Sequence, residues 1–401
     1  MSETIVRARF EPITYALPNG RTVTMSEAGE ADMDDLKAVY YAAYGGRYTL
    51  AEVNDRDKMK WCLNDPNYIW LVNRDGERIV CSVLFLVDPR HRISKTFAGV
   101  VHPEYRGQKM MVNTVRHGRD FVIDNGHADL MYAVVRTFVS ATFHIDLHSI
   151  GFVDLGIFPN VRRVKHYETH GFKVYYGPEV LARRRTTPAL IAPAARVYDI
   201  VRERLGLEPA RDADVDLDVR PPAPSFAFLI ESSRNVEHEY YEVRDEGALR
   251  FDFYPFHYPL VKLYTKDQKR AAYLYYQEVD GYASLLGLQT PGDTLIRDLV
   301  SVGEVAESLG VKYLEMLVSA YDPLAQKLAY EAGFLPCAYW PAAAMGADGQ
   351  REDYIVASCA FVPPHFKGLR LSKEVQPFLQ AYYTIYTDKL WEDMSNTHGT
   401  C

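Results

Sequence analysis

The spacing of apolar residues in the first half of the chain predicts a layered α+β domain. Residues 31–43 place Met33, Leu36, Val39 and Tyr40 three or four positions apart, which predicts an amphipathic helix. Short apolar runs predict strands at 21–28, 68–73, 78–87, 95–101, 129–135, 153–158 and 166–176, and further helices at 55–63, 106–125 and 140–149. This order predicts a mostly antiparallel sheet with helices on both faces.

The second half of the chain repeats part of this order. Strands are predicted at 226–230, 237–243, 249–254, 260–264, 271–277, 281–289, 311–318 and 353–361, and helices at 293–309 and 323–332. From 281 onward, strand, helix, strand and helix follow one another, and Gly333-Phe334 ends the second helix as Gly151-Phe152 does in the first half. We interpret this as an internal duplication of architecture.

Composition changes between the two halves. Residues 207–224 are acidic and rich in proline without a regular period, which predicts an exposed linker after a helical connector. We therefore divide the chain into an N-terminal extension (1–20), a first domain (21–178), the connector and linker (179–224), a second domain (225–363) and a C-terminal helix with its tail (364–401).

Composition and charge narrow the class of protein. The chain has 401 residues, 48% of them hydrophobic and 24% charged, which is typical of globular proteins. A net charge of −8 argues against nucleic-acid binding by bulk charge. The N-terminus has no signal-peptide pattern, and no run reaches the about 18 apolar residues of a membrane span. Five scattered cysteines without a CxxC pair favour a reduced, cytoplasmic protein.

The stretch from Phe97 to Met111, FAGVVHPEYRGQKMM, carries the clearest chemical signal. An apolar strand leads through a short loop directly into a helix, whose first amides have no acceptor within the helix. These amides and the helix dipole together favour an anion such as a pyrophosphate. Gly107 allows a tight turn, and Arg106 and Lys109 add positive charge.

At these residues the chain resembles the GNAT superfamily of N-acyltransferases. The signature of that family is a strand followed by Arg/Gln-x-x-Gly-x-Gly/Ala at the start of a helix, and Arg106-Gly107-Gln108 matches its first half. Lys109 and Met111 stand where the family usually has a glycine and a small residue. The resemblance covers about 21–176, with a looser one over 226–361, and implies two GNAT-like domains in tandem.

The resemblance also implies acetyl-CoA or another acyl-CoA as co-substrate. In the family, pantetheine lies between two strands that separate, which here are 95–101 and 129–135. Backbone groups of the first strand bond the pantetheine, and amides at the start of the helix hold the pyrophosphate. The implied cofactor-binding residues are Val100, Val101, Arg106, Gly107, Gln108, Lys109, Met110 and Met111.

Catalytic candidates follow from a second family pattern, Tyr-Glu-x-x-Gly-Phe, in which the tyrosine acts as an acid. The helix at 140–149 has Leu147 at the tyrosine position. A full match occurs only later, where Tyr167 becomes the candidate acid and Glu168 the candidate base. The alternatives are a tyrosine on the sheet surface and a solvated glutamate on a strand.

Other polar residues are candidates for acceptor binding. Arg136, at the end of a strand, could bind an acceptor carboxylate or form a salt bridge, and His102 could contact the substrate or order its loop. His144 and His148 have the spacing of metal ligands on a helix, but no third ligand is placed by the sequence. We therefore predict no metal.

The second half lacks the anion-binding signal. Its equivalent junction reads LQTPGDT, without an Arg-Gly turn, and Asp293 would repel a phosphate, so Asp293 or Thr294 is expected to cap the helix instead. We interpret this domain as a degenerate copy that shapes the acceptor site. The leading hypothesis is an acyl-CoA-dependent N-acyltransferase, with acetyl-CoA as the default donor and a small-molecule or protein amine as acceptor. The alternative is a non-catalytic acyl-CoA sensor or interaction module.

Overall fold

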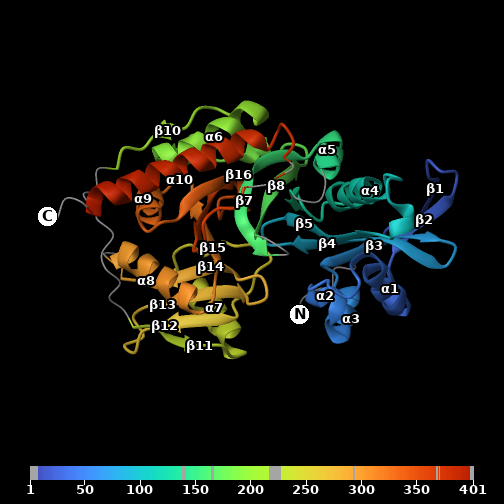
Figure 1. The fold of residues 1–401 in the computed structure, drawn as a ribbon, viewed down its shortest axis with the longest axis horizontal. Coiled ribbons are helices and arrows are strands. Elements are labelled where there is room, and N and C mark those ends of the chain that lie inside the picture. Colours follow the sequence, from blue (N-terminus) through green and yellow to red (C-terminus); the bar gives the residue numbers. More distant parts are fainter. Residues whose placement is uncertain are drawn as a thin grey trace. The chain divides into compact units, whose positions relative to one another are not determined.

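The computed structural model of the protein describes residues 8–137, 141–163, 167–215, 227–291, 294–366, 369 and 371–397 (Figure 1). Its contacts divide the chain into two compact units. Unit 1 comprises Met1–Ala133, Thr142–Phe152 and Val174–Pro178, and unit 2 comprises Val134–Ala141, Val153–Lys173 and Glu179–Cys401. The division therefore assigns 153–173, which we expected in the first domain, to unit 2.

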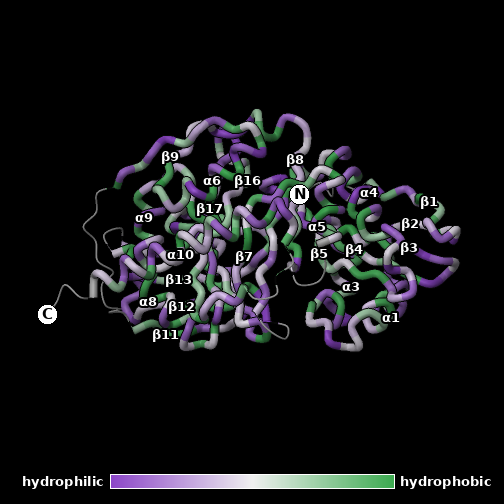
Figure 2. The backbone as a smooth tube through the Cα atoms, turned by 45° about the horizontal axis from the view of Figure 1, so that its top comes forward, coloured by the Kyte–Doolittle hydropathy of each residue, from purple (hydrophilic) through white to green (hydrophobic). Residues whose placement is uncertain are grey.

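Unit 1 is built on a sheet with the strand order β1-β2-β3-β4-β5-β6. Neighbouring strands are antiparallel except for β5 and β6, which are parallel. The strands are β1 (Ile13–Ala16), β2 (Thr22–Glu27), β3 (Tyr68–Asp75), β4 (Arg78–Asp88), β5 (Ile93–Val101) and β6 (Leu130–Arg136), the last of which continues into unit 2. Hydrophobic residues concentrate along β4 and β5 (Figure 2).

Helices cover both faces of the unit 1 sheet, as the sequence predicts (Figure 1). The helix α1 buries Leu36 and Tyr40 in a core that also contains Trp70 and Leu84 from the sheet. On the opposite face, α4 lies so close to β4 that a Cβ on Gly118 would meet the Phe85 ring at 2.1 Å. The helices of this region are η1 (Glu30–Asp32), α1 (Met33–Tyr44), α2 (Ala51–Asn54), α3 (Arg56–Asn64), η2 (Pro103–Tyr105), α4 (Met110–Asp124) and α5 (Ala141–Ser149).

Unit 2 has a sheet with the strand order β8-β7-β16-β17-β15-β14-β13-β12-β11. Its strands are β7 (Val153–Arg163), β8 (Tyr167–Tyr176), β11 (Leu229–Glu231), β12 (Val261–Tyr264), β13 (Ala271–Gln277), β14 (Tyr282–Gln289), β15 (Tyr313–Ser319), β16 (Leu335–Met345) and β17 (Arg351–Ala360). The last residues of β8 belong to unit 1. A separate pair is formed by β9 (Ala189–Leu190) and β10 (Arg211–Asp212). The helical segments are η3 (Leu181–Arg183), α6 (Ala192–Leu205), α7 (Asn235–Asp245), α8 (Leu295–Ser308), α9 (Pro323–Glu331) and α10 (Gln376–Thr397).

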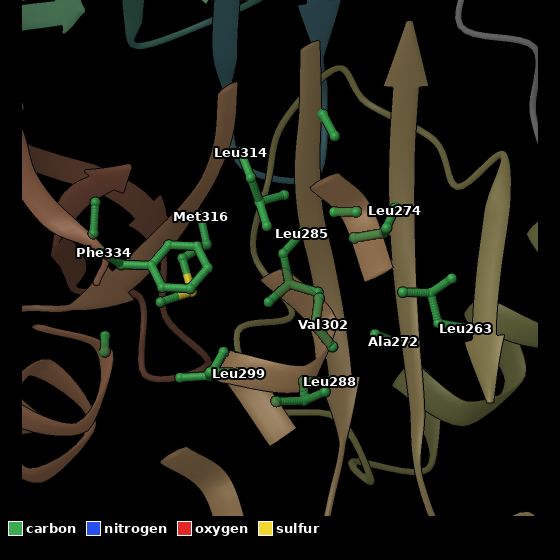
Figure 3. Packing of buried hydrophobic residues seen from close by; sticks show 14 of the residues in the cluster. Leu263, Ala272, Leu274, Leu285, Leu288, Leu299, Val302, Leu314, Met316 and Phe334 are labelled. Carbon is green, nitrogen blue, oxygen red and sulfur yellow. The ribbon is translucent and has the colours of Figure 1, made fainter. Parts of the chain in front are cut away.

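The strand orders of the two halves of the chain are the same, as a duplicated architecture would predict. The first half has the order β3-β4-β5-β6-β8-β7, and the second has β12-β13-β14-β15-β17-β16. In each half, one helix, α4 or α8, connects the two strands of the parallel pair, β5 with β6 or β14 with β15. The core beneath α8 combines Leu285 and Leu314 from the second parallel pair with Leu299 and Val302 from the helix (Figure 3).

Several elements differ from the sequence-based expectation. The segment 237–243, expected as a strand, lies in α7, whose buried Val236 and Tyr240 are four residues apart. Residues 249–254, also expected as a strand, contribute only a bridge between Arg250 and Leu288. The strands β1 and β16 were not predicted. Residues 216–224 of the expected linker lie outside the described residues.

Candidate functional site

The parallel strands β5 and β6 pair only over their first residues. Their ladder joins Ile93–Thr96 to Leu130–Ala133 and ends there within the described part of the chain. On its other side, β5 is irregular, because its register with β4 shifts between Ser82 and Leu84 and Ala98 has a positive φ of 52°. The backbone of β5 beyond Thr96 is therefore paired on one side and open on the other.

Tyr40 of α1 holds the irregular part of β5 by hydrogen bonds. Its hydroxyl group donates a hydrogen bond to the carbonyl oxygen of Ala98 and lies 3.4 Å from the Ser82 hydroxyl. The Ser82 hydroxyl in turn accepts a 2.7 Å bond from the indole nitrogen of Trp70. Burial raises the pKa of Tyr40 well above its usual range, so its hydroxyl remains a donor. These bonds fix the bulge at the point where the two strands separate.

The loop after β5 leaves a run of backbone amides without acceptors in the described part of the chain. Gly107 has a φ of 80° and Lys109 a φ of 58°, so two left-handed residues stand just before α4. The next amide of the chain to find a backbone acceptor is that of Asn113, which donates to Lys109 at 3.1 Å. Within the described residues, the amides from Gly107 to Val112 have no acceptor. Such a row of amides at a helix N-terminus suits an anion.

Tyr105 anchors this loop to the sheet. It is 3% exposed, and its hydroxyl donates a 2.6 Å bond to the Asp75 carboxylate and accepts one of 2.7 Å from the Arg21 guanidinium. The side-chain oxygen of Gln108 accepts a 3.1 Å bond from the Asn19 amide. The hairpin of β1 and β2, which the sequence did not reveal, thus holds the loop from outside.

A second set of bonds holds the first turn of α4. The Tyr15 hydroxyl donates to the Asn73 side chain at 2.7 Å, and Asn73 donates to the Thr114 hydroxyl at 2.7 Å. Thr114 closes the chain by donating to the carbonyl of Met110, the first residue of the helix. Asn73 and Thr114 are fully buried, so the helix start is fixed from within the unit.

His102 lies within the hydrogen bonding of the loop itself. Its Nε2 atom is 2.6 Å from the Arg78 guanidinium, and the Glu104 amide is 3.4 Å from its Nδ1 atom. Burial and the nearby Arg78 charge lower the pKa of His102, which keeps the ring neutral. These contacts match the loop-ordering alternative for His102.

The two residues that depart from the family signature have defined contacts. The Lys109 ammonium, which is more than half exposed, pairs with the Asp146 carboxylate at 2.7 Å. Met111 covers Gly99, since a Cβ on Gly99 would lie 2.8 Å from the Met111 sulfur. Lys109 is thus held toward α5, and Met111 packs over Gly99 of β5.

Arg136 and Glu168 meet as an ion pair in unit 2. The guanidinium donates two bonds, of 2.8 and 2.7 Å, to the two carboxylate oxygens. Burial raises the pKa of Glu168, but the two hydrogen bonds from Arg136, its positive charge and the His170 ring at 3.8 Å outweigh that effect and bring the pKa to about 2. Of the two alternatives for Arg136, the structure shows the salt bridge, and it gives Glu168 the character of a weak base.

Tyr167 begins β8, so the Tyr-Glu-x-x-Gly-Phe match lies on a strand and not at a helix end. Its ring is 5.9 Å from the Arg163 guanidinium. Leu147, at the tyrosine position of α5, is fully buried. The structure therefore pairs Glu168 with Arg136, whereas Tyr167 does not lie at the end of a helix as the family pattern expects.

The equivalent junction in unit 2 holds a carboxylate of its own. Asp298, in the first turns of α8, is fully buried and accepts bonds from the Thr294 hydroxyl at 2.9 Å and the Arg270 Nε at 3.0 Å. The Thr290 hydroxyl is a third donor. Thr294 occupies the N-cap position without capping a backbone amide, and Asp293 lies outside the described residues.

No group of three or more His, Cys, Asp or Glu side chains with metal-binding geometry occurs in the described part of the chain. His144 is fully buried, whereas His148 is exposed. No described helix is long and apolar enough to cross a membrane.

Comparisons with known proteins find similarity in structure alone. No family model and no curated protein matches the chain. An acetyltransferase of the GNAT family from Streptococcus pneumoniae matches with 17% identity over 39% of this chain and 99% of its own, at a TM-score of 0.35. The ribosomal-protein-S18-alanine N-acetyltransferase from Escherichia coli matches with 15% identity over 38% of this chain and 93% of its own, at 0.34. A ribosomal-protein-S5-alanine acetyltransferase from Vibrio fischeri matches with 12% identity over 42% of this chain and 98% of its own, at a TM-score of 0.35.

The Arg136–Glu168 pair predicts a pH dependence of stability. Because the pKa of Glu168 is lowered from 4.5 to about 2, its ionised form stabilises the fold above pH 4.5, and this contribution disappears as the pH falls toward 2. We expect the free energy of unfolding of the wild type to exceed that of Glu168→Gln by about 2–3 kcal/mol near pH 6. Urea unfolding between pH 6 and pH 2 should show this difference vanish. The exposed Glu203→Gln serves as control, and a difference that persists at pH 2 would contradict the assignment.

Proposed function

We propose that unit 1 binds an acyl-coenzyme A at the end of β5 and transfers its acyl group to an amine, as GNAT N-acyltransferases do. The observation that carries the proposal is the row of amides from Gly107 to Val112, which have no acceptor in the described part of the chain. A pyrophosphate is an anion of the right kind for such a row, because each of its oxygens can accept several amide bonds. Arg106, which is exposed, adds a positive charge beside it.

The open side of β5 supports the rest of the cofactor. Pantetheine carries two amides, and the strand end from Phe97 to Val101 has lost its partner on the β6 side. Backbone groups of Val100 and Val101 would bond the pantetheine as a missing strand would. The reactive thioester would then lie near Ala98, where the backbone is held in its irregular form by Tyr40.

For this reaction the main contribution of the protein is to position the amine and the thioester. A neutral amine attacks the thioester carbonyl carbon, the carbon–sulfur bond breaks, and the amine nitrogen loses a proton as the departing thiolate takes one up, which gives an amide and free coenzyme A. We propose that Arg136 does not bind the carboxylate of an acceptor directly, since its guanidinium is already bonded to Glu168. The low pKa of Glu168 favours a role in holding Arg136 over a role as base, and Tyr167 is a weaker candidate for the acid because it begins a strand. The acceptor is a small-molecule or protein amine, and the reduced cysteines favour a cytoplasmic enzyme.

A second candidate function is acyl-CoA binding without turnover. It is favoured by the two departures from the family signature, because Lys109 is engaged by Asp146 and Met111 lies against Gly99. Both side chains give the helix start and the end of β5 a different shape from that of a glycine and a small residue.

Acyl transfer predicts release of free coenzyme A thiol when acetyl-CoA and amines are supplied together. We expect the full chain to release thiol faster with a mixed set of amines, including a peptide with a free N-terminus, than with acetyl-CoA alone. A thiol-reactive dye measures this directly. Binding of acetyl-CoA without any amine-dependent release would favour the sensor, and the absence of binding would reject both functions.

The amide row predicts a specific effect of Gly107. In Gly107→Val, a β-branched side chain is forced to a positive φ, which distorts the turn. We expect at least a tenfold weaker affinity for coenzyme A in calorimetry, and little change in the already weaker binding of pantetheine, which has no pyrophosphate. Gly247→Val is the matched control, because Gly247 has a φ of 70° and open space around it in unit 2. Equal losses in the two variants would show a general strain effect and not a phosphate site.

A further inference from the structure

The second parallel pair, in unit 2, carries an unusual group of polar side chains. The strands β14 and β15 pair over only three residues, with Tyr282 opposite Tyr313 and Ser284 opposite Glu315. Because side chains alternate along a strand, these four lie on one face of the sheet. It is the face on which α7 packs, since Tyr275, the neighbour of Ser284 on β13, belongs to the same core as Tyr240 of α7.

The carboxylate of Glu315 is at the centre of this group. Glu315 is 2% exposed, and one of its oxygens accepts hydrogen bonds from the Tyr282 hydroxyl at 2.6 Å and from the Tyr254 hydroxyl. The Ser284 and Tyr282 hydroxyls are 2.7 Å apart. Burial and the Glu315 charge raise the pKa of both tyrosines well above their usual range, so both remain hydrogen-bond donors.

Aromatic rings lead from this carboxylate toward the surface. The His257 ring lies 4.6 Å from the Tyr254 ring and 4.8 Å from the Tyr275 ring, measured between centroids. Tyr258 follows at 5.9 Å from Tyr275 and is 42% exposed. The rings of Tyr254, His257, Tyr275 and Tyr282 are only partly buried. We call these four rings, together with Glu315 and Tyr258, the tyrosine cluster.

The fold itself does not require this arrangement. The matching ladder of the first half, Ile93–Thr96 with Leu130–Ala133, contains no carboxylate at any position and forms the same parallel pair. Burying a carboxylate costs several kcal/mol unless hydrogen bonds and opposite charge offset the loss of water. Here the hydroxyl groups of Tyr254, Tyr282, Tyr313 and Ser284 surround one buried carboxylate, although a strand pair can form without any such group.

We propose that the tyrosine cluster is a binding site for an organic ammonium ion. Aromatic faces attract a cation through their quadrupole, and the enclosed carboxylate adds a full negative charge. The hydroxyls of Tyr254 and Tyr282 bond that carboxylate, and a ligand would enter beside Tyr258, which is the exposed ring of the cluster. The site repels anions and thus differs in kind from the amide row of unit 1. It does not depend on the proposed coenzyme A site.

The test uses the full chain with 2-phenylethylamine as probe and 2-phenylethanol as its neutral counterpart. We expect calorimetry to show binding of the amine that is at least tenfold tighter than binding of the alcohol. In Glu315→Gln, which keeps the size of the side chain and removes its charge, the amine should bind at least tenfold more weakly. Equal affinity for amine and alcohol in the wild type, or unchanged amine affinity in Glu315→Gln, would overturn the proposal.

A surface variant protects the test against a folding defect. Tyr258→Ala removes the exposed ring of the cluster and should weaken the binding of the amine about threefold to tenfold. The matched control is Tyr383→Ala on α10, where the side chain is 55% exposed, and it should bind the amine like the wild type. If Glu315→Gln does not fold, equal amine binding by these two tyrosine variants rejects the proposal. The coenzyme A affinity is measured on the same samples, so failure of the amine site and failure of the coenzyme A site are told apart.

Discussion

Unpaired backbone groups where β5 leaves β6 are the constraint around which unit 1 is organised. A strand that loses its neighbour exposes donors and acceptors that must find water, a side chain or a ligand. Among the described residues, the ladder ends at Thr96 and Ala133, and soon afterwards the amides from Gly107 to Val112 also lack acceptors. Side chains around the site hold the backbone in this conformation without supplying acceptors for the unpaired amides among the described residues. Tyr40 holds the bulge, and Tyr105 and Thr114 hold the loop and the helix start.

The two halves of the chain differ in what lies at the start of the helix that follows the first strand of the parallel pair. Each contains a parallel pair that separates after a few residues and a helix that follows the first strand of the pair. In the second half, Asp298 fills the space near the helix start and is neutralised by Arg270, so the protein supplies its own anion there. A phosphate would have to displace that carboxylate. The same strand and helix order therefore gives one half an open helix N-terminus and the other a closed one.

The sequence predicted the fold where one periodicity dominated and failed where two were mixed. Leu36 and Val39 of α1 and the run into α4 follow helical spacing closely, and both helices were found. In α7, the aromatic residues Tyr240 and Tyr241 favoured a strand, although the buried positions are four apart. The strand β16 escaped because Pro336 and Pro341 interrupt it and its register shifts twice. These are cases in which packing overrides local preference.

Site residues followed the same rule. The loop from Arg106 to Lys109 was identified because its chemistry is local in sequence, as the turn, the helix start and the charges lie within a few positions. The bond between Arg136 and Glu168 spans 32 residues, and the contacts of Glu315 with Tyr254 and Tyr282 span 61 and 33. No periodicity reports such contacts, since they depend on which strands become neighbours. The Tyr167 match shows the converse, because a local pattern was present without the helix that gives it meaning.

The charges at the two parallel pairs now have a simple physical relation. In unit 1, amides without acceptors in the described part of the chain and the helix dipole create positive potential at the start of α4. In unit 2, the buried Glu315 carboxylate lies at the equivalent pair, bonded by tyrosine hydroxyl groups and close to aromatic rings. The two junctions therefore differ in polarity although their strand and helix order is the same, and they favour ligands of opposite charge.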